Sequence, residues 1–388
     1  MSAVPTVVLI FGLVFGFLSL GYVAYAMWRL SQFKALVPQP GVTALPPVTI
    51  LKPVCGLDTG LYENLRSFCE QDYPQYQIVF GVRETSDPAV AVVRRLMKEY
   101  PHRDLGLVVN ATVIGSNYKV SNLANMTHAA RHDILVIADS DMKVEKNYLR
   151  ALAIEFADPG VGAVTCLYRG VAAGGLASRL SAMAINEWFL PSVLVALRFR
   201  KLDFCFGSTM AVRREALAAT GGFAPLASLL ADDHMLGKRI SGAGYKVVLC
   251  PYIVDNIVSE PDFKSAFRHE LRWARTILSL EPVGYACSAI TYAVPVTLFC
   301  AVLSTWAGRL ETSAWGLAGA AVCLRMLMHF IARWRLHIRE PATPWLSPVR
   351  DLLGFFVWAM SFLGRGVSWR GRRFSIDKGG QLFSQQGV

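Results

Sequence analysis

Two carboxylates separated by a single residue follow an apolar stretch of the chain. Residues 134–138 read ILVIA, and Asp139 and Asp141 come directly after them. The stretch predicts a fully buried β-strand. Carboxylates at the end of a parallel strand can hold Mg²⁺ or Mn²⁺, and such a cation neutralises a diphosphate leaving group. The alternative is a turn in which both aspartates accept bonds from backbone amides, but the position after an apolar run favours the metal site.

A second acidic pair, Asp232 and Asp233, stands at the predicted start of a helix. Acids are common at helix N-termini simply as caps, and that explanation stays open. Adjacent carboxylates in a cleft also raise each other's pKa, which suits a general base that removes a proton from a hydroxyl.

A basic amphipathic segment at 263–280 carries His269, Arg272 and Trp273 on neighbouring turns of one helix face. The Arg272 side chain can pair with phosphate, and Trp273 can offer an apolar platform to a substrate ring. The alternative is a helix on the membrane surface, with an arginine that extends to water and a tryptophan at the interface.

Two further groups of polar residues suggest contacts to a nucleotide. Asp87 lies in a loop after a predicted strand, with Glu84 nearby. The alternative for Asp87 is an N-cap of the following helix. Lys119 and Asn122 can reach a diphosphate at a helix start, although a lysine that faces solvent is the ordinary case.

Strand and helix signals alternate through the polar middle of the chain. The predicted strands are 48–51, 77–82, 107–109 and 134–138, and the predicted helices are 61–70, 89–100 and 119–131. This alternation predicts an α/β fold with a mostly parallel sheet covered by helices, and with ligands at the carboxyl ends of the strands.

An apolar run from 7 to 28 contains no charge and is long enough to cross a bilayer as a helix. The positive charges of Arg29 and Lys34 come after the run, whereas a cleavable signal peptide has them before it. We therefore expect an N-terminal anchor, followed by a domain on the cytoplasmic side.

Later apolar runs lie at about 283–307, 315–332 and 352–363, and two or three of them should span a membrane. The stretch 175–199 is more polar and predicts an interfacial helix. Three full spans would place the arginine-rich tail outside, whereas the positive-inside rule favours the cytoplasm. We therefore expect one late run to be re-entrant or interfacial.

Composition limits the classes of function. The chain has 388 residues, of which 53% are hydrophobic and 17% charged, with a formal net charge of +11. This balance suits a protein held against an anionic membrane face. Aromatic residues lie in apolar runs rather than among Lys and Arg, which argues against nucleic acid as a partner. The eight cysteines show no metal-site spacing and predict packed thiols in a reducing compartment.

These features predict six parts along the chain. They are an anchor at 1–34, a linker at 35–47, a catalytic domain at 48–260, an amphipathic segment at 261–281, membrane helices at 282–366 and a basic tail at 367–388.

Several motifs taken in order resemble the ceramide glucosyltransferase family, glycosyltransferase family 21. The closer likeness is to its bacterial hopanoid-biosynthesis branch, and it rests on residues 188–192, 205–209 and 269–276. The family motifs are residues 51–58 (LKPVCGLD), Asp87-Pro88, Lys119 with Asn122, Asp139-Ser-Asp141, Asp232-Asp233, His269-x-x-Arg272-Trp273 and residues 368–374 (SWRGRRF).

The resemblance implies an inverting glycosyltransferase of the GT-A type that uses a UDP-sugar and Mg²⁺ or Mn²⁺. It implies that Asp87 contacts uridine, that Asp139 and Asp141 supply the metal and diphosphate site, and that Asp233 is the catalytic base. The family motif usually has Gln or Arg where His269 stands, so the role of this position is open.

The implied acceptor is a membrane lipid at a bacterial inner membrane. The hopanoid branch implies N-acetylglucosamine transfer to bacteriohopanetetrol, and the ceramide branch implies transfer from UDP-glucose. A processive polysaccharide synthase would need more spans than the chain offers, and a non-catalytic membrane protein should have lost carboxylates that are present here.

Overall fold

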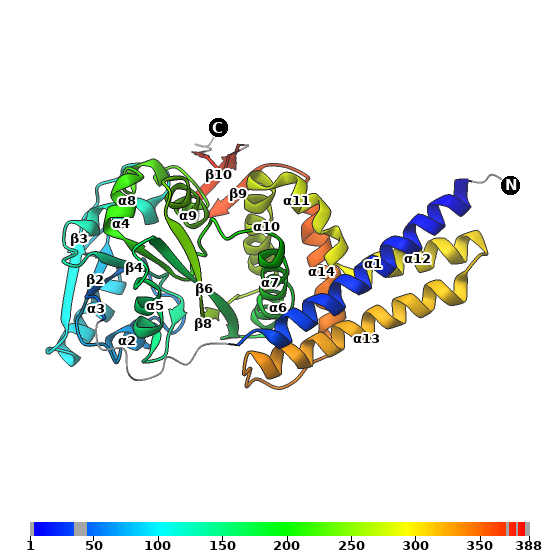
Figure 1. Cartoon of the computed structure of the whole chain (residues 1–388), viewed down its shortest axis with the longest axis horizontal. Coiled ribbons are helices and arrows are strands. Elements are labelled where there is room, and N and C mark those ends of the chain that lie inside the picture. The colour runs from blue at the N-terminus through cyan, green and yellow to red at the C-terminus, as the bar shows by residue number, and fades with distance from the viewer. Residues whose placement is uncertain (1–3, 35–44, 370–371, 378, 385–388) are drawn as a thin grey trace. The chain divides into compact units, whose positions relative to one another are not determined.

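The computed structural model describes residues 4–34, 45–369, 372–377 and 379–384, and its chain forms two compact units (Figure 1). The first unit comprises Met1–Phe33, Gly174–Arg200 and Glu260–Gly379, and the second comprises Lys34–Ala173, Lys201–Ser259 and Gly380–Val388. Residues 174–200 therefore belong to the first unit, although they lie within the range 48–260 that the sequence suggested as one domain. Most of the predicted linker and Arg370 in the predicted tail lie outside the described residues.

An eight-stranded sheet forms the centre of the second unit, with the strand order β3-β2-β1-β4-β7-β6-β8-β5. The strands are β1 (Val48–Pro53), β2 (Tyr76–Val82), β3 (Asp104–Val109), β4 (Ile134–Ile137), β5 (Met142–Lys143), β6 (Val161–Ala172), β7 (Met210–Arg213) and β8 (Lys246–Val258). Strands β3, β2, β1 and β4 are parallel neighbours, as are β6 and β8. Strand β7 is antiparallel to β4 and β6 and so joins the two parallel groups. The predicted α/β fold is confirmed.

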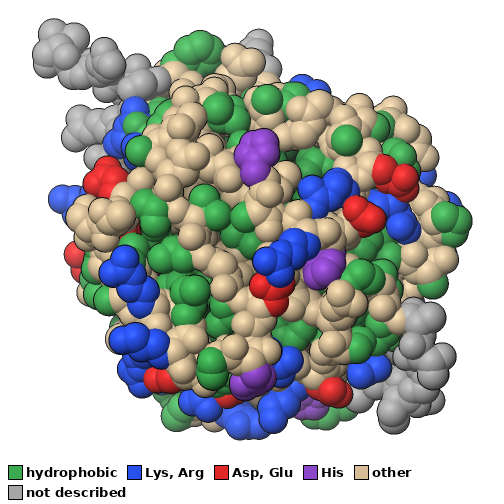
Figure 2. All heavy atoms as spheres, turned by 90° about the vertical axis from the view of Figure 1, so that its left-hand side faces the viewer, with side chains coloured by type: hydrophobic (Ala, Val, Ile, Leu, Met, Phe, Trp, Pro, Cys, Tyr) green, Lys and Arg blue, Asp and Glu red, His purple; other side chains and the backbone are tan. Residues whose placement is uncertain are grey.

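Helices connect the strands of this unit, as the alternation predicts. They are α2 (Leu61–Cys69), α3 (Ala89–Glu99), α4 (Tyr118–Thr127), α5 (Tyr148–Glu155), α8 (Arg214–Ala219), η2 (Ala224–Leu226) and α9 (Asp232–Gly242). Phe68 of α2, Phe80 of β2 and Val93 of α3 are fully buried in one shared core. Charged side chains of both signs are distributed over the face of this unit that Figure 2 shows.

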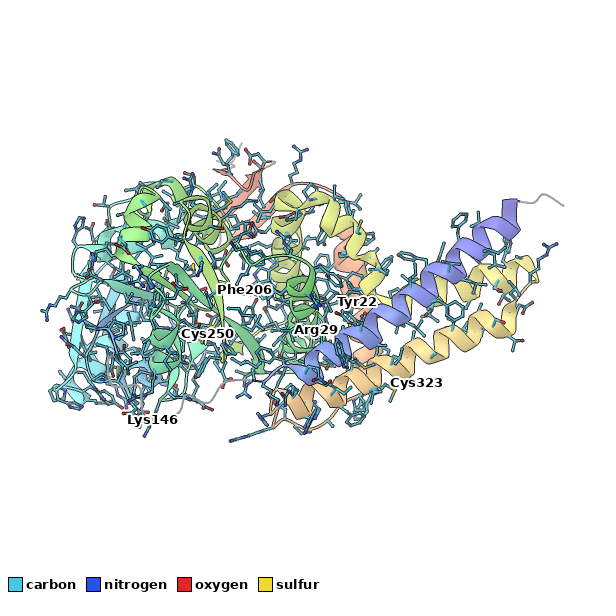
Figure 3. The ribbon with its side chains drawn as sticks, viewed as in Figure 1. Tyr22, Arg29, Lys146, Phe206, Cys250 and Cys323 are labelled. Carbon is cyan, nitrogen blue, oxygen red and sulfur yellow. The ribbon has the colours of Figure 1, made fainter. Side chains whose placement is uncertain are left out.

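The first unit is mainly helical. Its elements are α1 (Val4–Gln32), α6 (Leu176–Ala184), η1 (Ile185–Phe189), α7 (Leu190–Phe199), α10 (Phe263–Leu280), α11 (Pro282–Cys287), η3 (Ser288–Thr291), α12 (Ala293–Ala307), α13 (Glu311–Arg335), α14 (Leu346–Ser361), β9 (Gly366–Trp369) and β10 (Arg372–Ile376). Helices α1, α12 and α13 lie side by side (Figure 1). The side chain of Tyr22 on α1 donates to Ser192 Oγ at 3.0 Å, and Arg29 Nε donates to Leu194 O at 3.2 Å (Figure 3).

Among the described residues, Val8–Gln32, Leu176–Phe199 and Glu311–Arg335 are long and apolar enough to cross a membrane. Pro282–Thr291 and Ala293–Ala307 together would make a fourth such segment, but they are bent by 68°. This break falls in the predicted run 283–307, and it has the form of a broken span or a re-entrant loop. Leu176–Phe199 differs from the predicted interfacial helix, because its length and apolar composition qualify it as a candidate span.

Buried polar side chains of the first unit are paired with one another. His329 of α13 lies 2.7 Å from Glu187 of η1, and Arg325 of α13 lies 2.5 Å from Asp351 of α14. Asp351 also accepts from Val294 N at 2.8 Å in the first turn of α12, just after the bend. His329, together with Ser347 Oγ, which donates to Glu187 Oε2 at 2.6 Å, explains how Glu187 is accommodated among apolar residues, since an ionisable group away from water is costly unless it is paired.

All eight cysteines carry free thiols. Cys250 on β8 is buried, whereas Cys55, Cys287 and Cys323 are exposed, so the prediction of packed thiols is wrong for these three. Figure 3 labels Cys250 and Cys323.

Candidate active site

The end of strand β4 delivers the two aspartates of the Asp-x-Asp motif into a short loop, residues 139–141, which leads to β5. Strand β4 is flanked by β1 and β7, so the loop emerges from the middle of the sheet. Every backbone carbonyl of the loop accepts a hydrogen bond: Asp139 O from Lys52 Nζ at 2.6 Å, Ser140 O from Asn64 Nδ2 at 3.2 Å, and Asp141 O from Ile257 N at 2.9 Å. These bonds fix the backbone from which both carboxylates project.

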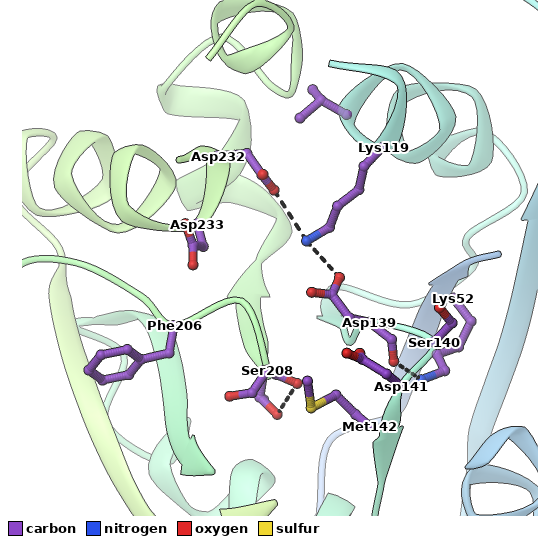
Figure 4. A network of polar contacts seen from close by, with 12 residues as sticks. Lys52, Lys119, Asp139, Ser140, Asp141, Met142, Phe206, Ser208, Asp232 and Asp233 are labelled. Atoms are coloured by element: carbon purple, nitrogen blue, oxygen red, sulfur yellow. Dashed lines mark hydrogen bonds and ion pairs between the residues drawn. The ribbon is translucent and has the colours of Figure 1, made fainter. Parts of the chain in front are cut away.

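Lys119 connects the Asp-x-Asp loop to the second acidic pair (Figure 4). Its Nζ lies 2.7 Å from Asp139 Oδ1 and 3.4 Å from Asp232 Oδ2. Burial disfavours the charged ammonium, but the two aspartates outweigh burial and raise the pKa of Lys119 above its usual value. Asn117 caps the start of α4, where its side chain accepts from Val120 N at 3.1 Å, and so fixes the first turn that carries Lys119.

Asp232 and Asp233 form the first turn of α9. Asp232 is buried, and Asn117 Nδ2 donates to its Oδ1 at 3.3 Å. Burial raises the pKa of Asp232 to about 6, against the lowering effect of Lys119. Burial also raises the pKa of Asp233, which accepts from His234 N at 2.8 Å. A carboxylate with a raised pKa is a better proton acceptor than an ordinary surface aspartate.

Gly207 lies between the two acidic motifs. A Cβ at this position would lie 3.1 Å from Asp233 Oδ2 and 3.5 Å from Asp139 Oδ2. The backbone at Gly207 therefore passes close to both carboxylates, so that a larger residue would crowd Asp139 and Asp233.

The oxygen atoms of Asp139 and Asp141 suit a divalent cation. Burial raises the pKa of Asp141 to about 6, and the nearby charges of Asp139 and Asp58 add to the rise. A cation would offset these like charges. Within the described residues, no three His, Cys, Asp or Glu side chains are grouped to hold a metal, so diphosphate and water oxygens would have to complete the coordination, as is common for Mg²⁺.

Three further residues of this unit were predicted to contact the nucleotide-sugar, and two of them, Asp87 and Asn122, bond to backbone atoms. The Asp87 carboxylate accepts from Gly56 N at 3.0 and 3.1 Å and from Ala89 N at 2.9 Å, so it links the loop after β1 to the start of α3. Asn122 is buried and donates to Gly81 O at 2.8 Å. Glu84 is exposed. The structure therefore groups Lys119 with Asp139, Asp141, Asp232 and Asp233. Asp87 and Asn122 instead bond to backbone atoms, and the Glu84 carboxylate accepts from Ser86 Oγ at 3.5 Å.

The predicted acceptor residues lie on α10 of the first unit. His269 Nδ1 lies 2.8 Å from Glu260 Oε1, and the rings of His269 and Trp273 are 4.3 Å apart. Arg272 is half-buried on the same helix. As expected from their spacing, these three residues lie on one face of α10.

Lys52 and Asn117 belong to this site but were not among the residues predicted for it. Lys52 is fully buried, its Nζ lies 3.8 Å from the centre of the Phe68 ring, and burial lowers its pKa to about 7. The position of Lys52 inside an apolar strand could have predicted its role in the site, since lysine is almost never fully buried without a partner. For Asn117, the signal is an N-cap residue that directly precedes the helix of Lys119.

The mostly parallel sheet, with an Asp-x-Asp loop at the end of β4 and a second acidic pair at the start of α9, defines a glycosyltransferase of the GT-A type. A mannosyltransferase from Pyrobaculum calidifontis, solved in complex with GDP-Man and Mn²⁺, has a similar fold. The TM-score is 0.53 at 20% sequence identity, over 91% of this chain and 98% of that one.

The sequence profile of glycosyl transferase family 21 matches residues 12–382, and the chain belongs to this family. It is a UDP-sugar-dependent glycosyltransferase with several apolar helices. Ceramide glucosyltransferase 3 of Caenorhabditis elegans is 24% identical over 351 residues, which cover 88% of this chain and 75% of the relative. Ceramide glucosyltransferase 1 of the same organism is 22% identical over 92% of this chain and 76% of the relative. These relatives do not confirm the closer likeness to the hopanoid branch.

Proposed function

We propose that this chain transfers one sugar from a UDP-sugar to the hydroxyl of a membrane lipid, with inversion at the anomeric carbon. The cluster of Lys119, Asp139 and the Asp232–Asp233 pair carries the proposal, because it combines a diphosphate-binding cation with carboxylates suited to accept a proton. The apolar helices of the first unit support an acceptor that resides in a membrane.

In the proposed reaction, Asp233 removes the proton of the acceptor hydroxyl as its oxygen attacks the anomeric carbon. The bond to the diphosphate breaks on the opposite face of the sugar, and UDP leaves. Asp139 and Asp141 would hold a divalent cation, which supplies positive charge to the diphosphate when it is bound. Lys119 adds a fixed ammonium beside that position, and Asp232 holds this ammonium in place.

The acceptor that the relatives favour is ceramide, with UDP-glucose as donor. Both nematode relatives that align with most of this chain are named as ceramide glucosyltransferases. The alternative, N-acetylglucosamine transfer to bacteriohopanetetrol, rests only on the short motifs at residues 188–192, 205–209 and 269–276. We therefore place the ceramide-type reaction first.

Arg272 and Trp273 of α10 remain proposed contacts to the acceptor, as the family resemblance implies. Trp273 offers an apolar face, and Arg272 offers a cation to a headgroup or phosphate. His269 is tied to Glu260, so its proposed role is to hold the Trp273 ring, which lies 4.3 Å away, rather than to bind the acceptor itself. Asp87 and Glu84 remain proposed contacts to the nucleoside, and Asn122 remains a proposed support of the diphosphate site.

The positive charges that follow the first apolar helix favour a catalytic unit on the cytoplasmic side of the membrane. UDP-sugars are then available in the same compartment. The free thiols are compatible with such a reducing compartment.

The test is transfer by the purified full-length chain in lipid nanodiscs. UDP-glucose or UDP-N-acetylglucosamine is combined with ceramide or bacteriohopanetetrol, and lipid products are identified by mass spectrometry. We expect a single added hexose on ceramide, formed at about a hundredth of the wild-type rate or less by the Asp233→Asn variant. A hopanoid product alone would favour the alternative acceptor, a ladder of sugars would indicate a processive synthase, and no lipid product from any pair would refute the proposal.

A further inference from the structure

The loop that precedes the second acidic pair, residues 227–231, is held on one side by the approach to α4. Asn117 N donates to Ala227 O at 2.8 Å, and Asn117 Nδ2 donates to Leu229 O at 2.8 Å. A Cβ at Gly115 would lie 2.3 Å from Ala227 O, so this close approach requires glycine. The same segment of chain thus positions both Lys119 and the entry to α9.

The C-terminal segment of the chain, residues 380–382, holds the other side of this loop. Leu230 N donates to Gly380 O at 3.0 Å, and Leu382 N donates to Ser228 O at 2.9 Å. The Leu382 side chain is buried, with 4% of its surface exposed. Residues 260–379 belong to the first unit, and the chain returns to the second unit at Gly380. The backbone groups to which residues 380–382 bond lie just before Asp232 in the sequence.

These contacts affect the position of the proposed catalytic carboxylate, Asp233. Residues 228–230 are bonded through backbone atoms on both sides, and Ala231 then leads directly into the first turn of α9. The orientation of a helix's first turn follows from the backbone that enters it. Displacement of a reacting group by about 1 Å can cost about 100-fold in rate, so a restraint at this place matters more for turnover than its few hydrogen bonds suggest.

We propose that residues 380–382 are a positioning element for the catalytic base: their backbone pairing with Ser228 and Leu230 fixes the start of α9 and so holds Asp233 at the acceptor hydroxyl. This inference rests on the proposed function, because it gives Asp233 the role of base. It assigns to the end of the chain a part in turnover that is separate from the Asp139 and Asp141 site.

The test compares two truncations of the full chain in nanodiscs. One ends at Gly379 and removes the positioning element, and the matched control ends at Ser384 and keeps it. Turnover with saturating UDP-sugar, the Kd of UDP by calorimetry, the thermal midpoint and amide hydrogen exchange of residues 228–232 are measured for both. UDP binding and hydrogen exchange need no acceptor, so they test the inference even if the lipid is wrongly identified.

For the chain that ends at Gly379, we expect kcat to fall about tenfold or more, the Kd of UDP to stay within about twofold, and hydrogen exchange at 228–232 to accelerate. The chain that ends at Ser384 should match the wild type. Unchanged kcat and exchange would overturn the inference. Parallel loss of kcat, UDP affinity and thermal midpoint would also overturn it, since that pattern indicates a general structural role.

A point substitution keeps the inference testable if the shorter truncation does not fold. Gly380 has a φ of +79°, which disfavours a β-branched residue, whereas the neighbouring Gly379 has ordinary space for a side chain. Gly380→Val should therefore lower kcat without weakening UDP binding, and Gly379→Val should not. Equal kcat in these two variants would refute the positioning role. Absence of transfer by the wild type would instead refute the proposed function.

Discussion

Replacement of Asp233 by Asn tests the chemistry of the site most directly. The amide keeps the size of the side chain, and its oxygen can still accept from His234 N, so the first turn of α9 should persist. It cannot accept the acceptor's proton. Because a general base contributes about 10²- to 10⁴-fold, kcat should fall by that amount. The Kd of UDP should change by no more than about threefold, because the ion pairs of Lys119 are with Asp139 and Asp232.

The pH dependence of the wild type gives a second measure of the same group. The base works only when it is ionised, so kcat should fall as pH decreases through the pKa of Asp233. Burial raises that pKa, and the fall should therefore begin above the range of an ordinary aspartate, which titrates near about 4. The acid limb of the profile should disappear in Asp233→Asn.

Asp232→Asn is the matched control, measured by a radiolabelled-sugar transfer assay and by UDP calorimetry. It removes a partner of Lys119 and should weaken UDP binding more than Asp233→Asn does, while leaving part of the turnover. If Asp233→Asn retains more than about a tenth of the wild-type kcat, Asp233 is not the base. If only Asp232→Asn abolishes turnover at saturating donor, the roles of the two acids are reversed.

Five further outcomes are expected. Removal of divalent cations with EDTA should abolish transfer and weaken UDP binding, and Asp141→Asn should require more Mg²⁺ for half-maximal rate; full activity in EDTA would contradict the metal site. Lys52→Met should raise the Mg²⁺ requirement while the thermal midpoint is maintained, because methionine fills the space and a buried charge is removed; unchanged Mg²⁺ dependence would argue against support of the Asp-x-Asp loop by Lys52. Glu187→Gln should lower the thermal midpoint without changing the Kd of UDP, because it weakens the buried contact with His329; an unchanged midpoint would show that the pair adds no stability. In a background with Cys55, Cys287 and Cys323 replaced by serine, Ser375→Cys should react with a membrane-impermeant reagent only after cells are opened; reaction in intact cells would place this part of the tail outside.

The sequence predicts the first part of the sheet well because each signal there is local. The run 134–138 is apolar because β4 is buried between β1 and β7, and the acids that follow mark its carboxyl end. The partnership of Lys119 with Asp232 could not be predicted in the same way. It depends on where two distant helix starts meet in the folded unit, and neither residue signals the other along the chain.

The apolar helices and the tail are harder to predict, because their contacts depend on partners far along the chain. Arg179, Asn186 and Glu187 make 175–199 too polar to predict a membrane span from the sequence. The partner of Glu187, His329, comes from a segment far along the chain, so the pairing has no local signal. The tail was interpreted from its arginines alone. Gly380 and Leu382 carry no charge and act through backbone atoms, which a pattern of side-chain types does not reveal.

The interleaving of the two units determines the order in which the protein can be completed during synthesis. Strands β1–β6 leave the ribosome before the apolar stretch 174–200, and β7 and β8 leave after it. Because β7 lies between β4 and β6, the sheet cannot be completed until the chain has been synthesised through that stretch and β7 has emerged. For the same reason, no contiguous fragment of the chain contains the catalytic unit alone. A fragment trimmed of both terminal helical regions would retain an apolar helix in its middle and lack residues 380–382.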